Sequence, residues 1–153
     1  MSILNKLQRL AKLSLCDWVL LGQLVAFAVL LEVGLRLFSL PSLVQMLLRG
    51  AHSRLGVVFP LFQHKVERSQ LFESAFLAAR IVRGQDSCLL CSLLLFWLLS
   101  VRRESAALLI GVRKDTKRLY SHAWIETPSM IKNEVYDHSQ VFFPLLRFFN
   151  ENV

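Results

Sequence analysis

Two residues of this chain have the types and the spacing of a nucleophile and its base. Cys88 follows Asp86 and Ser87, both good helix N-caps, and opens the nearly all-apolar run Cys-Leu-Leu-Cys-Ser-Leu-Leu-Leu-Phe-Trp-Leu-Leu. The backbone N–H groups and the dipole at a helix N-terminus favour the thiolate, which is the nucleophilic form of cysteine. A thiolate needs a base, and His122 lies 34 residues downstream. The two residues predict acyl transfer through a thiolate and an imidazole.

A third residue is needed to orient the imidazole, and two acids compete for that role. Alternation in Tyr-Ser-His-Ala-Trp-Ile-Glu predicts a strand over residues 118–126, in which His122 and Trp124 share one face. Pro128 can turn the chain into another strand over residues 130–136. With a three-residue loop, Glu134 lies opposite His122, whereas Asp137 points to the other face unless a bulge intervenes. Glu134 is therefore the predicted partner of the imidazole.

Helices must position the cysteine. Leucines recur at spacings of three and four between residues 4 and 49, which predicts helix, and Pro41 is expected to break it near the middle. Residues 52–60 read as a connection, and helical spacing resumes over residues 61–83 until Gly84 ends it.

The second half of the chain changes from helix to strand. The apolar helix that begins with the cysteine is predicted within residues 84–99 and should be central and buried on most sides. Alternation predicts strands at residues 106–112, 118–126 and 130–136, and the aromatic tail at residues 141–149 is expected to pack back on the domain.

These elements predict an α+β fold with a central helix against a small antiparallel sheet. An apolar helical region, residues 1–60, precedes this core, which is expected to occupy residues 61–153. The N-terminal region is either part of the same domain or a docking surface for a partner.

The most apolar run of the N-terminal region raises the question of a membrane span. It covers residues 18–31, contains Gln23 and ends at Glu32. Its 14 positions fall short of the roughly 20 apolar residues that a span needs. We therefore prefer a buried or partner-covered helix, with an interfacial helix as the second interpretation and a true membrane span as the third.

Composition narrows the function classes. The chain has 153 residues, of which 54% are hydrophobic, and a net charge of +7. No basic cluster is interleaved with aromatics, so nucleic acid is not an expected partner, whereas an acidic peptide or an anionic membrane surface fits the charge. Three cysteines do not form a disulfide framework and favour a cytoplasmic location, with membrane association left open. Cys88 and Cys91 lack the second ligand pair of a zinc site, so no metal is expected.

Several motifs resemble a known family, the transglutaminase-like leader peptidases of lasso-peptide biosynthesis. The resemblance covers roughly residues 70–136 and rests on Cys-Leu at residues 88–89, Ile-Gly-Val-Arg-Lys at 110–114, His-Ala-Trp-Ile-Glu at 122–126, and Asn133 with an acid after it.

The resemblance implies a papain- or transglutaminase-like core with Cys88 as nucleophile, His122 as base and Glu134 as the orienting acid. It implies removal of the leader from a ribosomally made precursor peptide, together with a separate leader-recognition protein and a macrolactam synthetase. No intrinsic cofactor is expected, and ATP dependence is implied by the resemblance alone. The chain departs from the family at Cys91, where arginine is common, and at Glu134, where aspartate is usual.

Other interpretations stay open. The same residues could transfer the acyl group to an amine, as a transglutaminase does, or the chain could be a catalytically silent module that binds a partner or a membrane surface. Cys91 is expected in the core, Trp124 in the core or a substrate cleft, and His52, His64 and His138 on the surface.

Overall fold

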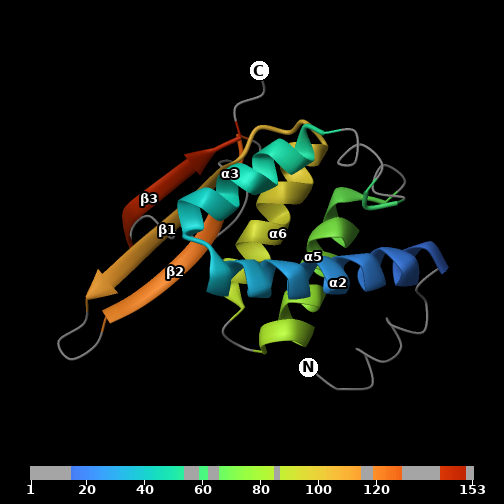
Figure 1. Ribbon diagram of the computed structural model, residues 1–153, viewed down its shortest axis with the longest axis horizontal. Helices are drawn as coiled ribbons and strands as arrows, with labels where there is room; N and C mark the ends of the chain where they lie inside the picture. Colours follow the sequence, from blue (N-terminus) through green and yellow to red (C-terminus); the bar gives the residue numbers. More distant parts are fainter. Residues whose placement is uncertain are drawn as a thin grey trace.

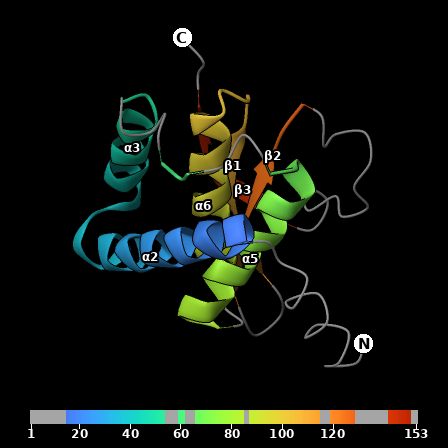
Figure 2. The same cartoon turned by 90° about the vertical axis from the view of Figure 1, so that its right-hand side faces the viewer.

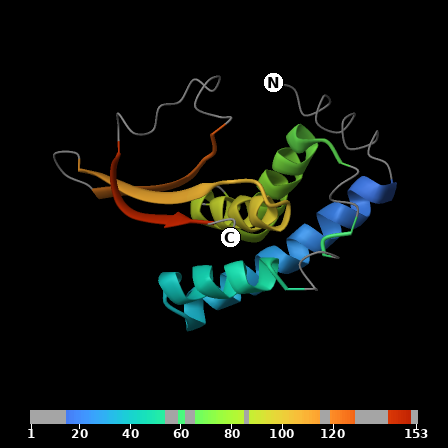
Figure 3. The ribbon, with the colours of Figure 1, turned by 90° about the horizontal axis from the view of Figure 1, so that it is seen from above.

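The computed structural model describes residues 15–53, 59–61, 66–84, 87–114, 119–128 and 142–150. The elements in these residues are α2 (Leu15–Leu37), α3 (Leu40–Ala51), α5 (Arg68–Arg83), α6 (Cys88–Val101), β1 (Ala107–Lys114), β2 (Leu119–Glu126) and β3 (Phe143–Phe149). Helix α6 lies at the centre, with α2 and α3 on one side and the sheet on the other (Figures 1 and 3). The predicted α+β architecture, a central helix against a small antiparallel sheet, is confirmed.

Helix α6 is central because nearly all of its residues are apolar. One hydrophobic cluster, which also takes residues from α2, α3, α5 and β1, buries Phe96, Trp97 and five leucines of α6, while Leu89 and Leu95 pack against it half-buried. The one buried hydroxyl near its end is satisfied, since Ser100 Oγ donates to Phe96 O over 2.7 Å. The N-terminal helices therefore share their core with α6.

The boundary between α2 and α3 lies where the proline predicts a break in the helix. Helix α2 ends at Leu37, and Pro41 occupies the first turn of α3, where its missing N–H would have no partner in any case. In the side view of Figure 2, α3 extends to one side of α6 and β2 lies on the other.

The apolar run of residues 18–31 was judged too short to span a membrane, but the helix that contains it is longer. Helix α2 is continuous over 23 residues and contains an 18-residue window with a mean hydropathy of 2.1, so by length and composition it could cross a membrane. The 14-residue count ended at Glu32, but this carboxylate is accommodated by ion pairs with Arg36 at 3.6 Å and Arg83 at 3.4 Å, and the helix continues beyond it.

Helix α5 begins later than predicted, at Arg68 instead of residue 61. Leu61 lies in a turn, where its N–H donates to Gln23 Oε1 of α2 over 2.8 Å. Glu67 has the extended conformation of an N-cap. The helix ends as predicted at Gly84, whose φ of +72° is readily adopted only by glycine.

The sheet has the order β2-β1-β3, with β1 antiparallel to both neighbours. The aromatic tail packs back on the domain as predicted, and it does so as strand β3 beside β1. The strand predicted over residues 130–136 lies outside the described residues.

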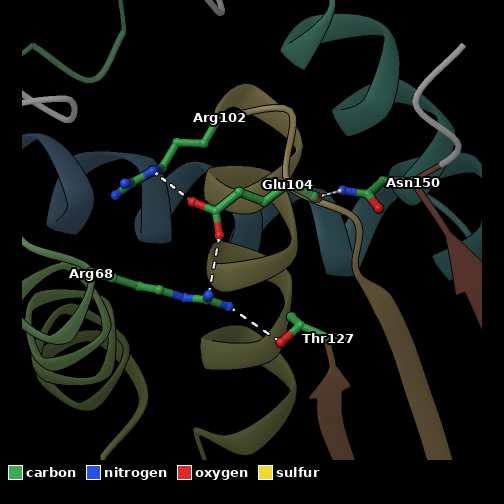
Figure 4. A network of polar contacts seen from close by, with 5 residues as sticks. All are labelled: Arg68, Arg102, Glu104, Thr127 and Asn150. Carbon is green, nitrogen blue, oxygen red and sulfur yellow. Dashed lines mark hydrogen bonds and ion pairs between the residues drawn. The ribbon is translucent and has the colours of Figure 1, made fainter. Parts of the chain in front are cut away.

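A polar network joins the ends of four elements (Figure 4). Glu104, which follows α6, pairs with Arg102 at 2.9 Å and with Arg68 of α5 at 3.5 Å. Arg68 also donates to Thr127 after β2 over 3.2 Å, and Asn150 after β3 donates to the Glu104 carbonyl over 2.8 Å. The network fixes α5 and both outer strands relative to the C-terminal end of α6.

Candidate active site

Cys88 is the first residue of α6, as the sequence predicts. Ser87 is the N-cap residue, and its carbonyl accepts the N–H of Cys91 over 2.8 Å, which closes the first turn. The Cys88 side chain is half-buried and its thiol is free. A half-buried thiol at a helix N-terminus combines access with nearby backbone donors.

Cys91 lies one turn further along α6 and packs against the main hydrophobic cluster, which confirms its predicted place in the core. Burial raises the pKa of the Cys91 thiol to about 11, and the neighbouring Cys88 adds to this shift. A thiol that stays protonated at neutral pH is a poor nucleophile. The two cysteines of the same helix are therefore suited to different roles.

We predict that Cys91 makes the protein less stable at alkaline pH. Between pH 9.0 and about 11 the folded state keeps a proton on Cys91 that the unfolded state has lost. The contribution of Cys91 to the free energy of unfolding is therefore complete below pH 9.0 and is lost as the pH rises through 11. After allowing for residual solvent exposure, this loss is at most about 2 kcal/mol. Urea unfolding at pH 8 and pH 10.5 measures it.

The control is Cys91→Ala, which cannot show this decline. The other titrating groups affect both proteins alike, so the difference between their two slopes isolates Cys91. Equal loss of stability in both proteins would refute the prediction.

The two faces of the sheet have different partners. Leu108 of β1, Ile125 of β2 and Phe148 of β3 pack into the cluster that contains α6, and we call their side the inner face. Leu109 and Trp124, which are register partners, form a second cluster with Phe142 on the outer face. This burial confirms the core interpretation of Trp124.

His122 lies on the outer face, because side chains alternate along β2 and it is two residues from Trp124. Its ring stacks on Trp124 with centroids 6.2 Å apart and lies tilted against the Phe142 ring at 5.3 Å. Helix α6 contacts β2 from the inner side. The structure thus packs together the two elements that carry Cys88 and His122, while the described contacts of the imidazole are on the outer face.

Charged residues hold the aromatic side chains of the outer face in place. Trp124 Nε1 donates to Glu126 Oε1 over 3.3 Å, and Arg147 of β3 pairs with Glu126 Oε2 at 3.1 Å. Arg113 of β1 lies over the Phe142 ring at 5.5 Å. This series of contacts from β3 to β2 sets the plane on which the imidazole stacks.

Gly111 was not predicted as part of the site, although it faces His122 in the register. A Cβ at this position would lie 2.8 Å from Cη2 of Trp124 and 2.9 Å from the carbonyl oxygen of Phe143. The indole therefore lies directly on the backbone of β1. An isolated glycine in a strand pattern is the sequence signal for such a close approach.

We expect Gly111→Ala to destabilise the protein by about 1–3 kcal/mol, because the methyl group overpacks against the indole and a backbone carbonyl. The midpoint of thermal unfolding measures the effect. Gly22→Ala is the matched control, since its Cβ meets nothing within 4 Å in helix α2, and it should stabilise by up to about 1 kcal/mol. Equal midpoints for the two variants would contradict the prediction.

Glu134 and Asp137, the two candidates for the orienting acid, lie outside the described residues, as do His64 and His138. His52 follows α3 on the surface, as predicted. Within the described ranges, no three His, Cys, Asp or Glu side chains gather in a way that could hold a metal ion.

Comparison with protein families gives one match. A family model described as the transglutaminase-like superfamily matches residues 63–147, which is more than half of the chain and includes both Cys88 and His122. Comparisons with curated proteins and with solved structures found no match.

Proposed function

Because the chain belongs to the transglutaminase-like superfamily, we propose that it is a cysteine peptidase that removes the leader from a ribosomally made precursor peptide in lasso-peptide maturation. The observation that supports the proposal best is the place of Cys88, half-buried and with a free thiol, as the first residue of a central helix. The superfamily supports cysteine peptidase or acyltransferase chemistry. The motifs around residues 88, 110–114 and 122–126 support the leader peptidase.

The proposed reaction has two steps. The Cys88 thiolate attacks the scissile carbonyl carbon, and the backbone N–H groups of the first turn of α6 are suited to stabilise the negative oxygen of the tetrahedral intermediate. The C–N bond breaks, the leaving amine takes a proton from the His122 imidazolium, and a thioester remains on Cys88. Water then gives a proton to His122 and attacks the thioester, which releases the carboxylate and restores the thiol.

Partners are part of the proposal. We propose that a separate leader-recognition protein presents the precursor and that a macrolactam synthetase takes up the cleaved product. The basic chain, with a net charge of +7, favours acidic partner surfaces. The chain itself is proposed to need no cofactor.

Product analysis tests the proposal. The purified chain is incubated with a precursor peptide and the leader-recognition protein, and the products are identified by mass. Two fragments whose masses sum to the precursor plus one water support the peptidase. An amide formed with an added amine assigns transglutaminase-type transfer instead. If the precursor is unchanged and Cys88 of the chain resists alkylation, the result favours a catalytically silent module.

A separate prediction decides between the two acids that could orient His122. We expect Glu134→Gln to lower the rate of leader cleavage by about 10²–10⁴-fold, because the side chain would no longer accept a charge-assisted hydrogen bond from the imidazolium. Asp137→Asn is the matched variant and should retain activity, since the alternation predicted from the sequence would put this residue on the other face. Retained activity in Glu134→Gln with lost activity in Asp137→Asn assigns the role to Asp137.

A further inference from the structure

Helix α2 divides into two opposite faces. The residues of its inner side, Leu20, Leu24, Ala28 and Leu31, are at most 2% exposed. Gln23 accepts a hydrogen bond from Leu61, and Glu32 pairs with Arg83 of α5. These contacts tie the inner side to the protein core, so the helix is held along its length.

The opposite side is exposed and apolar. It consists of Leu15, Trp18, Val19, Gly22, Ala26, Val29, Leu30, Val33, Arg36 and Leu37, which recur at helical spacing, and we call it the α2 outer face. Its large apolar side chains are 43–85% exposed, and Arg36 is its single charged residue. A continuous apolar stripe of six turns is larger than the scattered exposed residues of a typical surface.

The exposed charged residues of α2 and α3 are basic, although Arg36 also pairs with the half-buried Glu32 at 3.6 Å. In α2 and α3 the exposed charged residues are Arg36 and Arg49, whereas the acids Asp17 and Glu32 are half-buried. The sequence just before the helix adds Lys6, Arg9 and Lys12 and contains no acid. An apolar stripe bordered by basic residues matches a lipid surface with anionic headgroups.

We propose that the α2 outer face docks on an anionic phospholipid membrane, with α2 lying in the plane of the interface. A transmembrane position would break the contacts of the inner side with α5 and α6, whereas an in-plane position keeps them. A second copy of the chain is a poorer occupant, because it would bring two sets of basic residues together. The exposed Trp18 adds an amphipathic ring of the kind that prefers the interface.

Sedimentation with vesicles tests the docking with the full chain. We expect the chain to bind vesicles made of equal parts phosphatidylcholine and phosphatidylglycerol. Leu30→Glu should lower the partition coefficient at least about tenfold, because it removes an inserted apolar group and adds a negative charge. Arg36→Gln should lower it about fivefold on these vesicles and leave binding to pure phosphatidylcholine unchanged.

The matched control is Leu119→Glu, the same substitution at a leucine of similar exposure, 69% against 67% for Leu30. Leu119 begins β2, in the sheet on the other side of α6, so this variant should bind as the unchanged chain does (Figure 1). Equal losses in both variants, or no binding to the mixed vesicles, would overturn the proposal. So would a dimer in solution that Leu30→Glu converts to monomer without any vesicle binding.

Tryptophan fluorescence gives a second readout, which reports directly on Trp18 of the α2 outer face. Brominated phosphatidylcholine in the mixed vesicles should quench Trp18, because Trp97 and Trp124 are only 5% and 8% exposed. Trp18→Phe should remove that quenching. If the emission of the unchanged chain is not quenched, the α2 outer face does not enter the lipid.

Discussion

Replacing Cys88 by alanine is expected to lower leader cleavage by about 10⁴-fold or more. The substitution removes the only atom that can form the thioester and leaves a small apolar side chain in the first turn of α6, so the fold should be unaffected. The rate of leader release under single-turnover conditions measures the loss, and circular dichroism checks the helix content.

Cys91→Ala is the matched control. It makes the same substitution one turn along α6, at a thiol whose pKa of about 11 keeps it protonated at neutral pH. Activity should stay within about threefold of the unchanged chain. Comparable losses in the two variants would show that the helix, and not the thiol of Cys88, is what cleavage requires.

A double variant that combines Cys88→Ala with His122→Ala tests whether His122 acts with Cys88. The described contacts of His122 are with Trp124 and Phe142 on the outer face, so its cooperation with the thiol needs a functional test. Residues of one catalytic unit are non-additive, because removing one member makes the other idle. We expect His122→Ala alone to lower the rate of leader cleavage about 10³-fold or more. The double variant should cleave no more slowly than Cys88→Ala. Additive losses would place His122 outside the unit.

Asn150→Ala is expected to cost about 3–4 kcal/mol, which is a large part of the stability of a small domain. Asn150 is 3% exposed and makes three side-chain hydrogen bonds. It accepts the Ala106 N–H over 2.6 Å and donates to Ser100 Oγ over 3.0 Å and to the Glu104 carbonyl over 2.8 Å. Alanine leaves the Ala106 N–H and the Glu104 carbonyl without these partners, removes one of the bonds of Ser100 Oγ, and loosens the end of β3 from α6 (Figure 4). The free energy of unfolding in urea measures the cost.

Ser53→Ala controls for the loss of a side-chain hydrogen bond as such. Ser53 Oγ donates to the Gly50 carbonyl over 2.7 Å, but this bond is exposed, so water can replace it. A change within about 0.5 kcal/mol is expected. If Asn150→Ala costs no more than this control, the buried network does not hold the C-terminal strand.

Some features of the site depend on local chemistry, and these could be predicted. The pattern of a polar residue beside an apolar run marks the start of α6 and places Cys88 in the first turn, although the Ser87 side chain makes no capping hydrogen bond. The grouping of His122 with Trp124 follows from the two-residue period of a strand, and the register confirms it. Pro41 acts through its fixed φ and its missing N–H, and Gly84 acts through its freedom to adopt a positive φ, so the helix boundaries near them were also predicted correctly.

Other features depend on which distant segments pack together, and only the tertiary structure decided them. The third described strand is the C-terminal tail, since residues 143–149 pair with the edge of β1. This pairing could not be predicted, because alternation in one strand carries no information about which strand lies beside it. Hydropathy marked α2 as apolar, but packing against α5 and α6 determined that one side is buried and the other exposed. The sequence by itself therefore determined the helix that presents Cys88 and the face of β2 that carries His122. The tertiary structure decided that this face is the outer one, because α6 covers the inner side of the sheet, and this choice depends on contacts between segments far apart in the chain.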